Sequence, residues 1–153
     1  MTKWLSPREM RGWRAYAETN NHLLAALEAD LSPHGLTLGD YEVLVILSES
    51  PEQRMRMCDL SSRLGLSPSG LTRRLDGLVK LGYVSRQPST SDRRVMLATL
   101  TDKGLDAMHA AVADHVASVR QRLIDRLTPE QIDTLGDIFT SVAAGLRCEP
   151  TDA

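Results

Sequence analysis

The stretch that decides the fold runs from Met57 to Leu100 and reads MCDLSSRLGLSPSGLTRRLDGLVKLGYVSRQPSTSDRRVMLATL. Its first half predicts two short helices with a turn between them. The first helix covers about Cys58 to Leu64 and ends at Gly65, because glycine takes positive φ without a Cβ clash. Ser67 and Pro68 begin the second helix, since serine is a good N-cap and proline suits the first helical position.

The second of these helices has two contrasting faces. Leu71, Leu75 and Leu78 recur at helical spacing and therefore must face a core. The opposite face is small and basic, with no apolar side chain and no acid. A helix, a short turn and a helix with such an outer face form the pattern of a helix-turn-helix. The outer face consists of Ser69, Gly70, Arg73, Arg74, Gly77 and Lys80.

The second half of the stretch predicts a β-hairpin. Residues 83–86 and 95–100 have strand character, and the residues from Pro88 to Asp92 favour a turn. A hairpin directly after the second helix is the wing of a winged helix-turn-helix domain. Near the tip of this wing stand Asp92, Arg93 and Arg94.

At this point the sequence resembles the MarR family of bacterial transcriptional regulators. The matching features are Leu-Gly-Tyr-Val at 81–84, Asp-Arg-Arg at 92–94 and Leu-Thr-Asp-Lys-Gly at 100–104. The resemblance covers nearly all of the chain in length and helix order. It implies a triangular, mainly helical homodimer with two wings that binds double-stranded DNA. For many relatives it also implies a phenolic or other aromatic anion as effector.

The charge of the chain is unevenly distributed. Its net charge is −2, which looks wrong for a protein that binds nucleic acid. From Arg54 to Arg94, however, nine basic and three acidic residues give +6, while the rest of the chain carries −8. A basic segment that coincides with a helix-turn-helix indicates a DNA-binding surface. The alternative is a charged face that is merely solvated.

Helices are predicted on both sides of this stretch. Ser6 to Glu9 has the pattern of a capping box and begins a helix that runs to about Leu31. Thr37 and Asp40 begin a second helix in the same way, and Ser50-Pro51 ends it. Residues 54–57 are expected to form a short strand that pairs with the wing.

Two further helices follow the wing. Apolar residues at helical spacing predict a fifth helix of about 26 residues, from Thr101 to Leu127, and Thr128-Pro129 begins a sixth that ends near Arg147. The first, fifth and sixth helices carry more apolar surface than the middle of the chain can cover, which predicts a homodimer. A two-fold dimer places two recognition helices in successive major grooves, as a palindromic operator requires.

The predicted fold class is therefore mainly α with a small β wing. We expect residues 1–153 to form a single unit, with the winged helix-turn-helix in residues 37–100 and dimerisation helices in residues 6–34 and 101–147.

Several residues of the recognition helix are candidates for DNA contacts. Ser67, Ser69 and Gly70 open the helix, where backbone amides and the helix dipole favour phosphate. Arg73 and Arg74 are expected to point outward, and either could bind guanine through O6 and N7. The helical wheel places Thr72 less favourably. The alternative role for each arginine is surface solubility.

The wing supplies the second set of candidates. Arg94 at the tip of a hairpin can enter the narrow, electronegative minor groove. Asp92 could hold the Arg94 guanidinium in place or could form an Asx turn, and the two roles are compatible. The family resemblance implies that Arg94 inserts, which leaves Arg93 to face the DNA backbone.

Enzyme chemistry finds little support in the sequence, and we expect no enzyme, cofactor or metal site. No glycine-rich phosphate loop is present, the four histidines form no i, i+4 pair, and neither Cys58 nor Cys148 has a neighbouring ligand. Cys58 is expected to be a buried structural thiol rather than a redox sensor. Without a disulfide framework, a signal peptide or a membrane span, the expected location is the cytoplasm of a bacterium, at the nucleoid when DNA is bound.

The effector pocket is the least defined element. An aromatic wall beside a cation would suit an aromatic anion, and the alternative is ordinary packing of the aromatic residues. The resulting hypothesis is a repressor that leaves its operator when effector binds. A helical adaptor that binds another protein through the same fold is the alternative, but the basic residues favour DNA. The candidate pocket residues are Trp13, Tyr16, His34, Tyr41 and Arg56.

Overall fold

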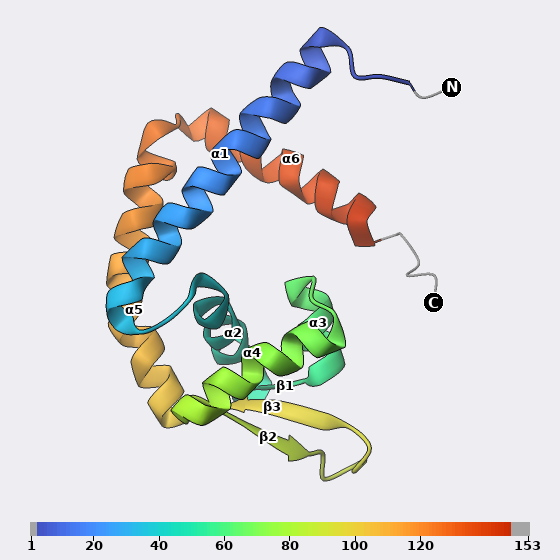
Figure 1. Cartoon of the computed structure of the whole chain (residues 1–153), viewed down its shortest axis with the longest axis vertical. Helices are drawn as coiled ribbons and strands as arrows, with labels where there is room; N and C mark the ends of the chain where they lie inside the picture. The colour runs from blue at the N-terminus through green and yellow to red at the C-terminus, as the bar shows by residue number, and fades with distance from the viewer. Residues whose placement is uncertain (1–2, 148–153) are drawn as a thin grey trace. The chain divides into compact units, whose positions relative to one another are not determined.

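The computed structural model describes residues 3–147. It is mainly helical with one small antiparallel sheet, so the predicted fold class is confirmed (Figure 1). These residues divide into two compact units, 3–115 and 116–147, and the boundary falls within the fifth helix. The elements are α1 (Pro7–Leu31), α2 (Leu38–Ser48), β1 (Arg54–Arg56), α3 (Met57–Leu64), α4 (Pro68–Leu81), β2 (Val84–Pro88), β3 (Met96–Leu100), α5 (Asp102–Arg122) and α6 (Pro129–Arg147).

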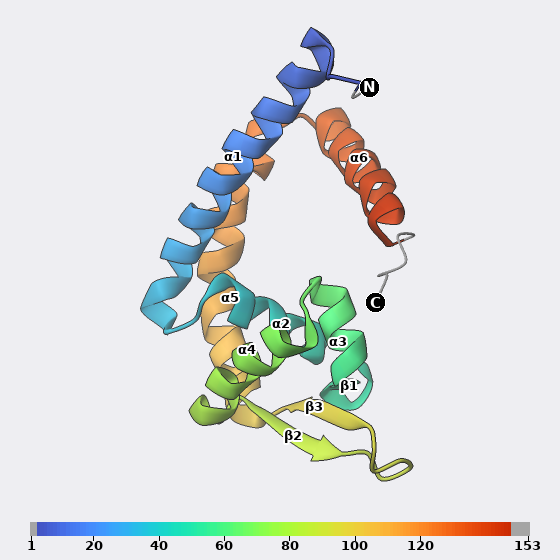
Figure 2. The same cartoon turned by 45° about the vertical axis from the view of Figure 1, so that its right-hand side comes forward.

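The sheet combines the wing with the short strand before α3. Its strand order is β1-β3-β2, and both pairings are antiparallel. Met55 of β1 lies opposite Ala98 of β3, so the predicted pairing of this segment with the wing is confirmed. In Figure 2 the sheet lies below α3 and α4, with the β2–β3 hairpin extending beyond the helices.

The core of the first unit forms where α2, α3 and α4 meet the sheet. Leu71, Leu75 and Leu78 of α4 are at most 1% exposed, as the leucine spacing predicts. Leu44 of α2 and Leu60 of α3 are fully buried in the same cluster. Each fully buried leucine stabilises the fold by about 1.5–3 kcal/mol, so this cluster holds α4 in place.

The helix starts follow the sequence signals. Ser6 and Glu9 form a capping box at α1, and Thr37 and Asp40 form another at α2. The backbone N–H of Glu9 donates to Ser6, and the carboxylate of Glu9 accepts from the backbone N–H of Ser6. These bonds lower the pKa of Glu9 below its ordinary value.

The fifth helix is shorter than predicted. It ends at Arg122, because Leu123 has φ −128° and ψ −65° and a 3-10 turn follows at Ile124–Arg126. An ion pair of 2.7 Å between Arg120 and Asp125 closes this turn. The apolar spacing continues through the break, so periodicity could not reveal it.

The expected burial of Cys58 is wrong. This thiol is exposed in the first turn of α3, 3.7 Å from a carboxylate oxygen of Asp59. The apolar face of α3 falls at Leu60 instead, which turns Cys58 to the outside. Cys148 lies outside the described residues. Among the helices of residues 3–147, none is long and apolar enough to cross a membrane.

A tight joint connects α4, β2 and α5. Gly82 has φ +76° and ends α4, and Tyr83 begins the extended chain. Thr101 donates its hydroxyl to the carbonyl of Gly82 at 2.7 Å and its backbone N–H to the carbonyl of Tyr83 at 3.0 Å. Lys103 donates to the carbonyl of Leu81 at 2.8 Å.

The same joint leaves no room for a side chain at Gly104. A Cβ on Gly104 would overlap the carbonyl of Tyr83, so only glycine fits there. The Leu-Gly-Tyr-Val and Leu-Thr-Asp-Lys-Gly segments are thus two sides of one contact.

Replacing Gly104 by alanine is expected to destabilise the protein. The added Cβ meets backbone, which cannot rotate away, so we expect a loss of about 2–3 kcal/mol in the free energy of unfolding. Urea denaturation followed by circular dichroism measures this loss.

Gly77→Ala is the matched control, because Gly77 lies in α4 and a Cβ there has open space around it. This substitution should stabilise the helix by about 0.5–1 kcal/mol. Equal effects of the two substitutions would show that the joint at Gly104 tolerates a side chain.

Candidate nucleic-acid interface

The first turn of the recognition helix α4 is capped by its own serine. The hydroxyl of Ser67 accepts a hydrogen bond from the backbone N–H of Gly70 at 3.1 Å and lies 3.2 Å from the hydroxyl of Ser69. Ser69 is exposed, whereas Gly70 is half-buried. The turn therefore offers the Ser69 hydroxyl and the amides of an exposed, uncovered helix end, as a phosphate contact requires.

The two arginines of α4 differ in their surroundings. Arg73 is exposed. Arg74 is half-buried, and its guanidinium occupies the space where a Cβ on Gly39 of α2 would stand. Arg73 thus points outward as predicted, but Arg74 folds back onto the first turn of α2. The absence of a side chain at Gly39 leaves the space that makes this possible.

Two neighbouring residues also depart from the expected pattern. Thr72 is exposed, although its hydroxyl donates to the carbonyl of Pro68 at 2.9 Å and is engaged within the helix. The outer face of α4 does carry an acid, Asp76, which forms an ion pair of 2.6 Å with Arg86 of β2. Sequence reasoning missed this residue because helical spacing places Asp76 near Arg73, whereas its partner lies in the wing.

The tip of the wing is shaped by an Asx turn. Asp92, Arg93 and Arg94 are all exposed. A carboxylate oxygen of Asp92 accepts from the backbone N–H of Arg94 at 3.0 Å, and the carbonyl of Asp92 accepts from the N–H of Val95 at 2.9 Å. The contact of Asp92 with Arg94 is therefore made to backbone, and the Arg94 side chain extends from a turn whose shape is set.

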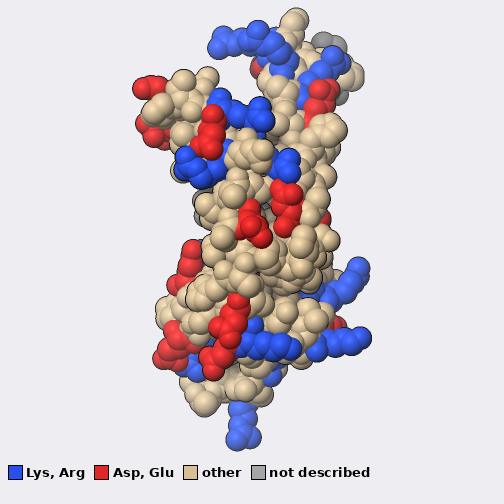
Figure 3. Space-filling view, turned by 90° about the vertical axis from the view of Figure 1, so that its left-hand side faces the viewer, with Lys and Arg blue, Asp and Glu red and all other residues tan. Residues whose placement is uncertain are grey.

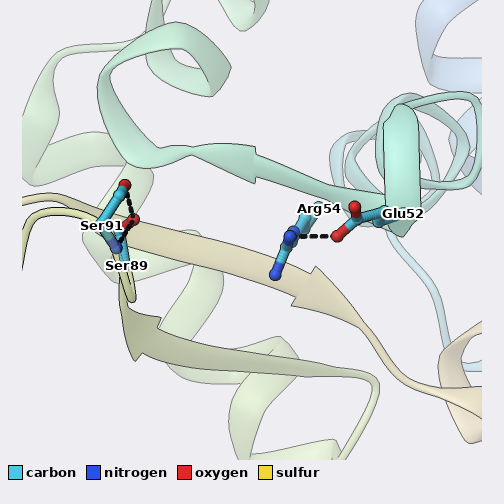
Figure 4. A network of polar contacts seen from close by, with 4 residues as sticks. All are labelled: Glu52, Arg54, Ser89 and Ser91. Atoms are coloured by element: carbon cyan, nitrogen blue, oxygen red, sulfur yellow. Dashed lines mark hydrogen bonds and ion pairs between the residues drawn. The ribbon is translucent and has the colours of Figure 1, made fainter.

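Two further polar contacts lie at the sheet, one where the wing turn begins and one at the start of β1. Figure 4 shows Ser89 and Ser91 side by side where the wing turn begins, with their hydroxyl oxygens 2.9 Å apart. It also shows Arg54, at the start of β1, paired with Glu52. The Glu52 contact neutralises Arg54, whereas Arg56 at the other end of β1 is exposed, as are Arg93 and Arg94 at the wing tip.

Cationic and acidic side chains are interspersed on one face of the winged part (Figure 3). On the face drawn in Figure 3, Lys and Arg side chains project from the lower half of the picture, where the winged part lies, with carboxylates beside them. Among residues 3–147, no group of three or more His, Cys, Asp or Glu side chains is placed to hold a metal ion.

A cavity lies on the other side of α2. It has a volume of about 520 Å³. The ring of Tyr41 forms part of its wall and lies 4.5 Å, centroid to centroid, from the ring of His115. Burial lowers the pKa of His115, and the nearby carboxylate of Glu42 acts in the opposite direction. The cavity is lined by Leu24, Leu27, Leu38, Tyr41, Glu42, Val45, Ile46, Arg63, Leu64 and His115.

One polar atom of a cavity-lining residue is buried without a partner. Among the described residues, Nδ1 of His115 is the buried side-chain nitrogen for which no hydrogen bond is formed. A buried polar atom without a partner is destabilising by about 1–3 kcal/mol.

The five residues suggested for an effector pocket do not gather in one place. Tyr41 lines the cavity. Trp13 and Tyr16 are exposed neighbours on α1, with ring centroids 6.0 Å apart. His34 lies 2.7 Å from a carboxylate oxygen of Asp114, and Arg56 is exposed on β1. Sequence reasoning missed His115, Glu42 and Arg63, because only the packing of α2 against α1, α3 and α5 brings them together.

The chain is similar in sequence and in structure to known transcriptional regulators. The sequence pattern of the MarR family matches residues 36–96. The structure is similar to that of AbsC, a MarR family transcriptional regulator from Streptomyces coelicolor, with a TM-score of 0.92 and 42% identity over 97% of this chain and 100% of AbsC. Sco3205 from the same organism, whose structure is a complex with DNA, has a TM-score of 0.92 and 38% identity over 100% of this chain and 95% of Sco3205.

Two further relatives are informative. The transcriptional repressor Rv2887 of Mycobacterium tuberculosis is 34% identical over 105 residues, which is 69% of this chain and 73% of the repressor. CouR of Rhodococcus jostii, in a structure with bound p-coumaroyl-CoA, is 27% identical over 91% of this chain and 92% of CouR, with a TM-score of 0.76. These alignments cover between 69% and 100% of this chain, and so include residues outside the winged part. The chain belongs to the MarR family of transcriptional regulators.

Proposed function

We propose that this regulator represses transcription by binding a palindromic, double-stranded DNA operator as a homodimer. The observation that carries the proposal is the pair of exposed arginines, Arg73 on α4 and Arg94 on the wing, that one winged unit presents together. One suits the major groove and the other the minor groove. The DNA complex of Sco3205 and the repressor Rv2887 support the same reading. The cytoplasm is the corresponding location.

The homodimer is supported by apolar surface on the terminal helices. Trp13 of α1 is 56% exposed, and Ile138, Val142 and Leu146 of α6 are 50–70% exposed. Large apolar side chains in a row are costly in water, so a second copy of the chain is the proposed cover. A two-fold pair would then present two recognition helices to two half-sites.

Release from DNA is proposed to follow from a small molecule in the cavity beside Tyr41. Aliphatic walls, the ring of Tyr41 and the cation of Arg63, which also lies 3.6 Å from a carboxylate oxygen of Glu49, suit an aromatic acid. The ligand would contact α1, α2, α3 and α5 together, so it could favour one arrangement of the winged part over another. The complex of CouR with p-coumaroyl-CoA supports an effector of this general kind.

Selection of DNA from random fragments tests this proposal directly. We expect an enriched palindrome, a complex with two protein chains by sedimentation, and release of the DNA by members of a set of aromatic acids. Protein that enriches no sequence, but captures a protein partner through the α4 surface, would favour the adaptor alternative.

Base readout is expected to depend on Arg73 more than on Arg74. Arg73→Ala should cost about 1–3 kcal/mol per half-site and relax the preference at one base position. Arg74→Ala should weaken binding to all sequences alike, because the Arg74 guanidinium is held against α2. Titration of each variant against single-base operator variants measures both effects. A base-specific loss in Arg74→Ala alone would reverse this assignment.

Arg94 is expected to read the shape of the minor groove. Arg94→Ala should weaken operator binding about tenfold and flatten the preference for A/T-rich flanks, since narrow grooves attract an inserted cation. The unfolding temperature should hardly change, because the wing tip is exposed.

Two substitutions distinguish the turn that Asp92 forms from the charge that it carries. Asp92→Ala removes the Asx turn and should weaken binding, whereas Asp92→Asn keeps the turn and should preserve binding. Equal losses in both variants would show that the charge of Asp92, and not its turn, supports Arg94.

A further inference from the structure

We propose that the ion pair between Asp76 and Arg86 is a positioning device that fixes the wing relative to the recognition helix. Through it, Arg73 and Arg94 reach the major and minor grooves in register. The inference rests on the proposed DNA binding and assigns positioning residues for it. Neither Asp76 nor Arg86 needs to touch a base for this role.

The geometry of the pair links two elements that have different tasks. Nη2 of Arg86 lies 2.6 Å from Oδ1 of Asp76, and the Arg86 side chain is 29% exposed. Arg86 is the middle residue of β2 and lies opposite Ala98 of β3, which is fully buried. The backbone of Arg86 is therefore held by the sheet, and its guanidinium transmits that position to α4.

The covalent connection between α4 and β2 does not by itself fix the angle between them, and the Asp76–Arg86 ion pair is proposed to fix it. Helix and strand are joined through Gly82 and Tyr83, and Figures 1 and 2 show them diverging from that corner. Asp76 lies five residues before the end of α4, about 7.5 Å along the helix axis. Arg86 lies two residues beyond the start of β2. The ion pair closes a triangle whose third corner is Gly82-Tyr83, which sets the angle between helix and strand.

The negative charge of Asp76 is unfavourable on the side of α4 that is proposed to meet DNA. Asp76 follows Arg73 by three residues, so its carboxylate lies on the side of α4 proposed to meet DNA. An unpaired carboxylate there would repel phosphate, and the guanidinium of Arg86 cancels that charge. The Asp76 side chain is 58% exposed, so the pair contributes little to folding. Charge cancellation and a fixed geometry are the contributions that remain, and the test below separates them.

The test uses Asp76→Ala, Arg86→Met and the exchanged pair Asp76→Arg with Arg86→Asp. The single variants change the net charge in opposite directions, so the measured quantity is the ratio of affinities for the selected operator and for random DNA. We expect both single variants to lower this ratio about 3- to 10-fold. The exchanged pair has the parent's net charge and should regain most of the ratio.

Coupling to the wing gives the second measurement. The loss caused by Arg94→Ala should be smaller in the Asp76→Ala background than in the parent, because a misplaced wing has less contact to lose. The matched control is Asp125→Ala, which removes the exposed 2.7 Å pair with Arg120 outside the winged part and should leave the ratio unchanged.

Three outcomes would overturn the inference. A changed preference at one base in Asp76→Ala alone, without rescue by the exchanged pair, would make Asp76 a base-reading residue. Additive losses with Arg94→Ala would show that helix and wing act independently. Equal losses on operator and random DNA would show that the pair contributes charge alone.

A measurement without DNA separates this inference from the proposed function. Residual dipolar couplings of the α4 and β2–β3 amides report the angle between helix and wing. We expect that angle to change or broaden in Asp76→Ala and to return in the exchanged pair. An unchanged angle would overturn the inference even if the parent binds its operator. Failure of the parent to bind any DNA would overturn the proposed function and leave the angle measurement standing.

Discussion

The backbone of Gly104 lies so close to the carbonyl of Tyr83 that no side chain fits between them, and the rest of the winged part depends on this contact. The end of α4, the first strand of the wing and the start of α5 all meet there. Thr101 and Lys103 satisfy the carbonyls at the end of α4 with hydrogen bonds. Because these groups belong to backbone, main-chain geometry fixes the corner at which the wing leaves the recognition helix, and the proposed role of the Asp76–Arg86 ion pair is to fix the angle at that corner.

The proposed DNA-binding surface and its surroundings contain four arginines whose environments differ. Arg73 and Arg94 are exposed and available to a ligand, whereas Arg74 lies against Gly39 and Arg86 is paired with Asp76. Four arginines that look alike in a sequence thus divide into two that face outward and two that connect elements. The net charge counts all four arginines equally. It therefore describes attraction to DNA, but it does not show which arginines face outward and which connect elements.

The first unit combines this surface with a cavity whose walls come from four helices. α2 contributes to both, because Gly39 in its first turn accommodates Arg74 while Tyr41 lines the cavity. A molecule that shifted α2 would therefore act on Arg74, in the middle of the recognition helix. This shared helix gives the proposed effector a short physical route to the DNA-binding surface.

The sequence by itself determined the elements whose causes are local. Capping boxes at Ser6 and Thr37, the leucine spacing of α4 and the turn residues of the wing each act within a few residues, so helix starts, the recognition helix and the hairpin were predictable. Tertiary structure decided what depends on distant neighbours. The exposure of Cys58, the inward turn of Arg74 and the gathering of Tyr41 with His115 all follow from packing between segments far apart in the chain. The end of α5 at Arg122 has a local cause, the backbone conformation of Leu123, but the apolar spacing continues through it and does not record it. Periodicity records which face of a helix is apolar, but it carries no information about which residue of another element meets that face.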